Sequence, residues 1–486
     1  METATKIVGP KTPLPWYQPL PQKAAAMLRR FEVNRAVFFS VLTQGWSALA
    51  GPVTILAIAH WLSAVEQGFY YTFSSVLALQ IFVELGLVTV IIQVASHEWA
   101  FLKRESDGRI AGDPQALSRL ASLLRFALKW YAVCGLLVIV GLSVGGFVFF
   151  SAKPHPEVAW QWPWFALCGI AGLALMMSPI FSVIEGCNQV ASIYSFRFIQ
   201  GILNSLAVIV CLLLGMGLYA LAVAALVRFM CGLIFIAWKH RGFIRQILTT
   251  EIKERINWRG DVWPFQWRIG VSWISGYFIF CIFTPVMFYY HGPKVAGQMG
   301  MTWTLVAAIE TFACAWISTQ TPRFGILIAQ KRYPELDRLF RRLFWITLGI
   351  AGACSMAVFT MVCWIKSSGI GFAGRILPLL PVALLLGQRI CNVIVIDMAY
   401  YLRAHKREVL LIPSLTTAVL VGLSTWLMGA RYGAVGAAAG FFVVTVVWGL
   451  PSCFFVFRRF RGLWHQSPAK STGSDESSDD GMVKDS

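Results

Sequence analysis

The sequence predicts an all-α membrane protein with about twelve transmembrane helices in two pseudo-symmetric six-helix halves. Of its 486 residues, 57% are hydrophobic and 13% are charged, and the mean hydropathy is +0.65. Soluble domains carry about 25% charged residues. The apolar residues here form runs longer than the roughly 18 residues that a spanning helix needs. The 20 Trp and 35 Phe are typical of a large lipid-facing surface with interfacial aromatic anchors.

Basic residues predict the topology. The formal net charge is +18, but Lys and Arg alternate from loop to loop, which argues against nucleic-acid binding. With both termini in the cytoplasm, cytoplasmic segments hold 33 of the 41 Lys and Arg and the opposite loops hold 5. This asymmetry is the positive-inside pattern. The larger cytoplasmic connections (96–125, 239–268 and 322–341) are amphipathic and basic, which suits helices lying along an anionic inner leaflet.

Five segments are expected along the chain. Residues 1–36 form a proline-rich cytoplasmic arm, 37–238 the N-terminal six-helix lobe, and 239–268 a basic cytoplasmic linker. Residues 269–457 form the C-terminal six-helix lobe, and 458–486 an acidic, serine-rich cytoplasmic tail whose composition predicts disorder. The expected spans are 37–62, 70–95, 126–150, 161–184, 197–215, 217–238, 269–290, 300–321, 342–365, 376–400, 409–428 and 434–457.

The two halves repeat one pattern. The first helix of each half contains a proline, Pro52 and Pro285, and we expect both helices to be interrupted there and to act as hinges. The sixth helices are both rich in small residues, at 217–225 and 433–440. An even number of spans per half makes the repeat parallel. Repeats with interrupted helices at matching positions favour alternating access around a site between the halves.

Four ionisable residues lie near the middle of predicted spans: Glu84, Arg228, Glu310 and Arg389. A charge at mid-bilayer depth costs roughly 2.5–3.5 kcal/mol on insertion scales, so it usually faces a partner or a watery cavity. Four such residues in one chain indicate a path for a polar or charged substrate. We therefore expect a transporter.

Each of these residues also has a structural interpretation. Glu84, with Gln80 one turn earlier, and Glu310 either line a cavity or fix the packing of neighbouring helices. Arg389, with Asn392 one turn on, has a planar fork that suits phosphate oxygens.

The alternative for Arg389 is a structural pair with an acid such as Asp397 or Glu310. Arg228 lies among small residues that let another helix approach, so packing competes with substrate binding there. Glu185 and Asp397 end the fourth helices of the two halves, positions that suit a gate or a cap. Lys129 is a further gate residue or simply snorkels to the interface.

Catalytic and metal-binding patterns are not evident in the sequence. The 11 Cys are scattered singly without a CxxC, and the 7 His lie near helix ends without ligand-like clustering. We expect no cofactor and no metal. A coupling ion, proton or sodium, stays open.

Three stretches resemble a known family. Residues 51–70 and Glu84-Leu85-Gly86-Leu87 look like the opening of polysaccharide-export membrane proteins, and residues 432–438 are similar to that family's last helix. These are the O-antigen and lipid-linked oligosaccharide flippases of the multidrug/oligosaccharidyl-lipid/polysaccharide flippase superfamily. The resemblance covers about residues 30–460. It implies a V-shaped, MATE-like fold whose first, second, seventh and eighth helices line a central cleft, with Glu84 and Glu310 in it.

The same resemblance implies a function in polysaccharide biosynthesis. The protein would flip a polyprenyl-diphosphate-linked oligosaccharide, an O-antigen or exopolysaccharide repeat unit, across the bacterial inner membrane by alternating access. Arg389 and Arg228 are the nearest matches to the basic cavity residues that engage the lipid diphosphate. Membrane lipids and other polysaccharide assembly proteins are the implied partners.

Other classes remain alternatives. A cation-coupled multidrug exporter of the same fold would be expected to carry an acidic residue in its first helix, and residues 37–62 contain none. A peptidoglycan lipid flippase usually has two more helices. A membrane enzyme of glycan assembly would need a catalytic outer loop or a nucleotide-sugar domain, and the outer loops are short. We therefore expect no enzymatic activity.

Overall fold

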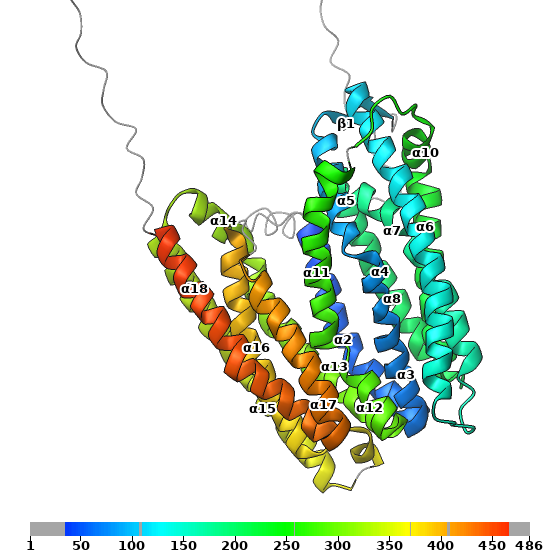
Figure 1. Ribbon diagram of the computed structural model, residues 1–486, viewed down its shortest axis with the longest axis vertical. Helices are drawn as coiled ribbons and strands as arrows, with labels where there is room; N and C mark the ends of the chain where they lie inside the picture. The colour runs from blue at the N-terminus through cyan, green and yellow to red at the C-terminus, as the bar shows by residue number, and fades with distance from the viewer. Residues whose placement is uncertain (1–34, 106–108, 257, 370, 406–408, 466–486) are drawn as a thin grey trace, which may run out of the picture.

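The computed structural model describes residues 35–465 except 106–108, 257, 370 and 406–408. Almost all of the predicted arm and most of the predicted tail therefore lie outside the described residues. Figure 1 shows two helical lobes that meet at one end and diverge at the other, so that the molecule has a V shape. Apart from one small β-hairpin, the regular structure of the described residues is helical, which confirms the predicted fold class.

The N-terminal lobe carries the β-hairpin and the first set of helices. Its elements are α2 (Arg35–Trp61), α3 (Ala64–Leu77), η1 (Ala78–Gln80), α4 (Ile81–Glu84), α5 (Leu87–Trp99), β1 (Leu102–Arg104), β2 (Ile110–Gly112), α6 (Pro114–Ser151), α7 (Gln161–Gly186), α8 (Val190–Leu213), α9 (Tyr219–Phe235), η2 (Ile236–His240) and α10 (Arg241–Thr249).

The second half of the chain forms the other lobe. Its elements are η3 (Trp258–Val262), α11 (Trp263–Phe280), α12 (Phe283–His291), α13 (Pro293–Thr319), α14 (Thr321–Ala329), α15 (Tyr333–Ser367), η4 (Gly371–Arg375), α16 (Leu379–Ala404), α17 (Leu411–Val444), η5 (Thr445–Gly449) and α18 (Leu450–His465).

The number of spans agrees with the prediction. Among the described residues, nine helices are long and apolar enough to cross a membrane, and two bent helix pairs raise the number to eleven. The last of them, the 54-residue segment Leu411–Trp464, contains Gly433 at φ 64° and ψ −147°. Trp448 Nε1 donates a hydrogen bond of 2.9 Å to Thr416 Oγ1, so the stretches before and after Gly433 lie side by side. The chain therefore reverses its direction at Gly433. This segment is therefore a hairpin of two spans.

The predicted helix interruptions are only half right. Helix α2 runs unbroken through Pro52, so the interruption expected there is wrong. In the second half, the chain bends by 44° between α11 and α12, close to Pro285. The corresponding break in the first half lies in the second span, where α4 and α5 meet at 46°. Hinge motion at either proline stays a prediction.

Segments on the side predicted to be cytoplasmic fold onto the N-terminal lobe. β1 and β2 pair antiparallel with Lys103 opposite Ala111. The amide of Gln246 on α10 donates to the Ile110 carbonyl and accepts from the Ile110 N–H, both at 2.8 Å. Helix α10 also buries Phe243 against the core that it shares with α6. The first part of the predicted linker (239–268) therefore belongs to this lobe.

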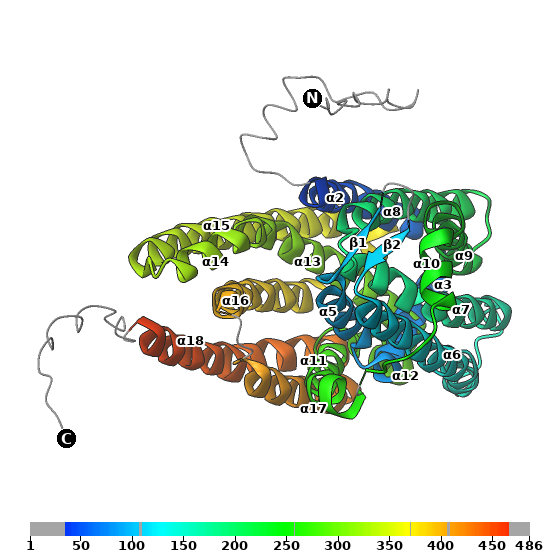
Figure 2. The ribbon, with the colours of Figure 1, turned by 90° about the horizontal axis from the view of Figure 1, so that it is seen from above.

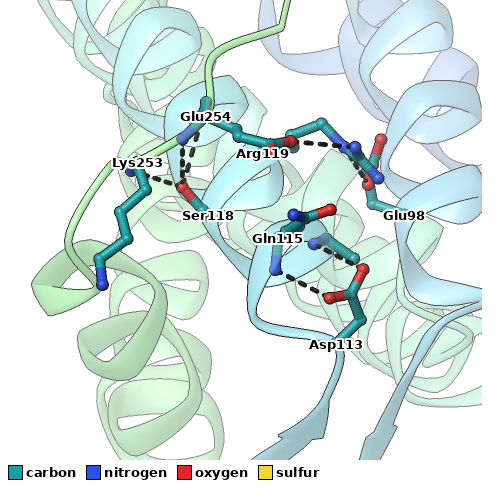
Figure 3. A network of polar contacts seen from close by, with 8 residues as sticks. Glu98, Asp113, Gln115, Ser118, Arg119, Lys253 and Glu254 are labelled. Atoms are coloured by element: carbon teal, nitrogen blue, oxygen red, sulfur yellow. Dashed lines mark hydrogen bonds and ion pairs between the residues drawn. The ribbon is translucent and has the colours of Figure 1, made fainter.

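Figure 3 shows how the next part of the linker is held. Ser118 Oγ on α6 accepts hydrogen bonds from the backbone N–H groups of Lys253 at 2.8 Å and Glu254 at 3.0 Å. Arg119 bridges Glu98 and Glu254 at 2.9 and 3.2 Å. The linker is therefore fastened to α6 as far as residue 254.

Two of the three basic connections contain a short helix of their own, α10 in 239–268 and α14 in 322–341, and that these helices lie along the inner leaflet stays a prediction. Residues 96–125 contain the β-hairpin and the start of α6. In the connection at 322–341, only α14 is a separate helix, and from Tyr333 the basic segment continues directly into the span α15. The start of α6 and the start of α15 continue without a break into the spans, so their backbone N–H and C=O groups are hydrogen-bonded within the helices.

The lobes meet at the end that carries the predicted outer loops. Helices α3 and α13 cross closely there, because a Cβ on Gly68 would lie 2.0 Å from the Pro293 carbonyl oxygen. Gln67 Nε2 donates to the Gly297 carbonyl at 2.9 Å. Arg375 Nη2 donates to the Leu62 carbonyl at 2.7 Å. Burial lowers the pKa of Arg375, but an arginine stays charged at physiological pH.

At the other end the lobes are apart. Helices α10 and α14 lie at the two separated tips in Figure 1, and both belong to connections that the basic residues place in the cytoplasm. The V therefore opens toward the predicted cytoplasmic side.

Candidate functional site

Ionisable residues within the spans form one cluster in each lobe. The first cluster surrounds a cavity of about 310 Å³ inside the N-terminal lobe, and its wall includes Gln80, Glu84 and Arg228. The second cluster joins Glu310 on α13 to Arg389 on α16. Among the described residues, no hydrogen bond or ion pair links the two clusters. The expectation that Glu84 and Glu310 line one cleft stays a prediction.

The helix break between α4 and α5 positions Glu84. Leu85 (φ 50°) and Gly86 (φ 66°) both have left-handed backbone conformations, which end α4 directly after Glu84. A Cβ on Gly86 would lie 2.4 Å from Ile269 Cγ2 of α11, so the break packs against the first helix of the second half. Tyr131 on α6 donates a hydrogen bond of 3.3 Å to Glu84 Oε1. The carboxylate is thereby held at the cavity wall.

Arg228 is the least engaged cation of this cavity. Its side chain on α9 is exposed and lines the wall, and its guanidinium has no hydrogen-bond or ion-pair partner among the described residues. Gln200 Nε2 on α8 donates to the Arg228 carbonyl at 3.0 Å. This places the amide of Gln200 beside the arginine.

Arg197 and Gln200 are wall residues that the sequence interpretation missed. Arg197 is the first residue of the predicted span 197–215 and was given no functional interpretation, whereas in the structure it lies within α8 and lines the cavity. Its Nη2 pairs with Glu185 Oε2 at 2.8 Å. Arg197 and Gln200 are three residues apart, which puts both side chains on one helix face. This spacing is the sequence signal that could have identified them. Glu185, predicted as a gate or cap, therefore contacts the wall residue Arg197 but does not itself line the cavity.

The cavity wall therefore suits an anionic or hydroxyl-rich ligand. It carries two arginines and one carboxylate, together with the amides of Gln80 and Gln200. Guanidinium groups bind phosphate oxygens through charge-assisted hydrogen bonds. Side-chain amides donate to and accept from hydroxyl groups.

The cluster of the C-terminal lobe is an interhelical ion pair in which only one guanidinium nitrogen of Arg389 is bonded, while its Nε and Nη2 are buried without a partner among the described residues. Arg389 Nη1 lies 2.5 Å from Glu310 Oε2, and Asn392 Nδ2 donates to the same oxygen at 2.7 Å. The guanidinium carbon lies 4.9 Å from the centre of the Trp303 ring. The structural alternative for Arg389 is therefore realised with Glu310, and a role of Arg389 in substrate binding stays a prediction.

The two remaining gate residues lie apart from this cluster. Asp397 is fully buried on α16 and accepts a hydrogen bond from Thr347 on α15. Lys129 is exposed on α6 and is not part of the wall of the N-terminal cavity. Their gating roles also stay predictions. Within the described residues, no group of three or more His, Cys, Asp and Glu side chains could hold a metal ion.

Comparison with known proteins identifies the fold. No protein-family profile matches the sequence, and no curated protein matches it. Solved structures do match. The lipid II flippase MurJ in an inward closed conformation superposes with a TM-score of 0.63 at 10% identity, over 88% of this chain and 90% of that one.

Two MATE transporters are similar over comparable lengths. The MATE transporter DinF-BH matches with a TM-score of 0.55 at 13% identity, over 88% of this chain and 96% of that one. A mutant of the Vibrio cholerae MATE transporter VcmN matches with a TM-score of 0.53 at 15% identity, over 92% and 100%. The chain has a MATE-like transporter fold. Its structural neighbours are transporters and flippases rather than enzymes, and it is a multi-pass membrane protein.

Proposed function

We propose that this protein flips a polyprenyl-diphosphate-linked oligosaccharide, an O-antigen or exopolysaccharide repeat unit, across the bacterial inner membrane. The fold that it shares with the lipid II flippase MurJ supports a lipid-linked cargo. The observation that carries the proposal is the Arg228 side chain on the wall of the N-terminal cavity, whose guanidinium has no partner among the described residues. A diphosphate would supply the missing acceptors.

The neighbours of Arg228 suit the rest of such a head group. Arg197 brings a second guanidinium, already paired with Glu185, to the same wall. Gln80 and Gln200 offer amides to sugar hydroxyls. Because a cation in the spans costs free energy unless it has a partner, a site that keeps Arg228 open favours binding of an anion.

The V shape supports alternating access. The lobes are apart at the predicted cytoplasmic tips and closed at the α3–α13 crossing, so the head group enters from the cytoplasm while the polyprenyl tail stays in lipid between the lobes. Rocking of the two lobes then exposes the head group on the other side. The bends at α4–α5 and α11–α12 are the positions at which the backbone can take up this motion.

A cation-coupled multidrug exporter is the second candidate. Glu84 favours it, because a carboxylate with a single described hydrogen bond, from Tyr131, can take up a proton or a sodium ion. DinF-BH and VcmN, which share the fold, are MATE transporters. The absence of acidic residues from 37–62 and the two arginines on the cavity wall argue against a cationic cargo.

Lipid-linked glycans in a deletion strain test the proposal. We expect intact repeat units to accumulate on the cytoplasmic face. Complementation with Arg228→Gln should clear them at least about tenfold more slowly than the wild type does, since a hydrogen bond to a charged group contributes roughly 1.5–3 kcal/mol. Arg431→Gln, which removes an exposed cation in the hairpin turn beside Gly433, is the matched control and should clear them normally.

The same strains separate the two candidates. Normal lipid intermediates in the deletion strain, with increased sensitivity to cationic dyes, would contradict the flippase and support the exporter. In that case Glu84→Gln should abolish dye efflux while Arg228→Gln retains it.

A further inference from the structure

A second cavity, of about 430 Å³, lies in the C-terminal lobe between α15, α16 and α18. It shares no wall residue with the N-terminal cavity, and neither Arg389 nor Glu310 lines it. Helices α15 and α18 flank α16 on the side of the lobe that faces away from the N-terminal lobe (Figures 1 and 2). In a membrane, this side of the molecule meets lipid.

The charged wall residues are gathered at one end of the cavity. Helix α15 begins at Tyr333 and α18 ends at His465, so Asp337, Arg341 and Arg461 all lie within about three turns of the predicted cytoplasmic helix ends. The wall deeper in the membrane is apolar. Its residues there include Phe344, Ile394 and Phe454.

We call the charged end of the cavity its mouth. Asp337 does not neutralise Arg341 there, because the Asp337 carboxylate is already paired with Arg461 and hydrogen-bonded to Tyr401. Arg461 donates to it from Nη2 at 2.5 Å and from Nε at 3.2 Å, and the Tyr401 hydroxyl donates at 3.0 Å. Arg341 is exposed and has no ion pair or hydrogen bond with another described residue. The mouth therefore carries one uncompensated positive charge at the depth of lipid head groups.

Aromatic residues line the wall about one turn deeper than Arg341. Trp345, on the wall next to the mouth, is 67% exposed, and Phe454 is 48% exposed. The Arg458 guanidinium lies 5.8 Å from the centre of the Phe454 ring. Exposed tryptophan beside arginine is typical of the boundary between acyl chains and head groups.

We propose that this cavity is a binding site for an anionic phospholipid of the inner leaflet. The lipid phosphate accepts hydrogen bonds from Arg341, and one acyl chain fills the apolar space between Phe344, Ile394 and Phe454. Cavities of roughly 300–1,000 Å³ with a few polar groups at one end are the usual size and chemistry of ligand sites. Charge and position together select a bilayer lipid over a soluble ligand. The bound lipid fastens α18 to α15, whose Phe457 and Phe340 rings lie 5.5 Å apart.

Photocrosslinking of the full-length protein in lipid bilayers tests this site. Nanodiscs would contain a phosphatidylglycerol analogue with a photoreactive acyl chain, or the matching phosphatidylcholine analogue, and labelled peptides would be mapped by mass spectrometry. We expect phosphatidylglycerol to label residues 337–345 and 450–461 preferentially. Arg341→Gln should lower this labelling about fivefold, the factor that one arginine contributes near an anionic surface.

Arg342→Gln is the matched control, because Arg342 is equally exposed on the next position of α15 but does not line the cavity. It should leave the labelling unchanged. Equal labelling by the two lipids, or an equal loss in both variants, would overturn the proposal. Ile394→Trp, which fills the cavity, adds an independent readout: a folded variant should lose labelling by phosphatidylglycerol, and undiminished labelling would also overturn the proposal.

Discussion

Arg389 on α16 and Glu310 on α13 join two spans of the C-terminal lobe through an ion pair of 2.5 Å between Nη1 and Oε2. The arginine is 2% exposed and the glutamate 20% exposed. Asn392 Nδ2 shares the same carboxylate oxygen at 2.7 Å. The pair therefore holds a buried cation in place, and removing the anion alone leaves that cation uncompensated.

Glu310→Gln should destabilise the protein by about 3–5 kcal/mol, whereas the double variant Glu310→Leu with Arg389→Met should recover most of that loss, because apolar pairs often replace buried ion pairs without cost. Denaturant titration of the purified protein in detergent measures both. Transport by a stable double variant would show that Arg389 is structural. Stability without transport would place Arg389 in the substrate path, and equal instability of the two variants would contradict the role of the pair.

Gly86→Ala should destabilise the protein by about 1–3 kcal/mol, because alanine disfavours the left-handed backbone and its Cβ would clash with Ile269. Gly169→Ala is the matched control. A Cβ at Gly169 meets nothing within 4 Å, and the change should stabilise α7 by about 0.5–1 kcal/mol. Thermal unfolding, monitored by size-exclusion chromatography of heated samples, compares the two variants. A Gly86 variant as stable as the wild type would show that the α4–α5 break is not needed.

Gln67→Ala should weaken the closure between α3 and α13, because the Gln67 amide bridges the lobes through its hydrogen bonds to Gly297 and Arg375. Loss of about 1 kcal/mol changes the ratio between the state in which α3 and α13 are in contact and the state in which they are apart about fivefold. Spin labels at the exposed Arg245 on α10 and Arg323 on α14, in a background without the 11 native cysteines, report the distance between the cytoplasmic tips. We expect Gln67→Ala to have a larger population in which the labels at residues 245 and 323 are close together. An unchanged distribution would mean that other contacts hold the closure.

Ser118→Ala should release the linker from α6, because two backbone N–H groups lose their acceptor. The cost is about 1–3 kcal/mol for donors left unsatisfied. Hydrogen exchange at residues 253 and 254 should accelerate. Ser96→Ala, at an exposed serine that donates only to the Gln93 carbonyl, should leave this exchange unchanged. Equal protection in both variants would contradict the fastening of the linker.

Some of the candidate site follows from the sequence, and some does not. Glu84, Gln80 and Arg228 were recognisable one by one, because a polar or ionisable residue within an apolar run is visible without any structure. That they share one cavity, together with Arg197 and Gln200 from α8, depends on how α4, α8 and α9 are rotated against one another. Hydropathy along the chain carries no information about that rotation.

Local properties of the chain therefore determine the class of the protein, the approximate spans and the asymmetry of basic loops, since each depends on short stretches of sequence meeting lipid or water. Tertiary structure alone decides that the first-half break lies at Leu85–Gly86 rather than at Pro52. It also decides that Arg389 pairs with Glu310 and not with Asp397. The physical reason is that such pairs join residues far apart in the chain, and only the packing of whole helices determines which side chains come within hydrogen-bonding distance.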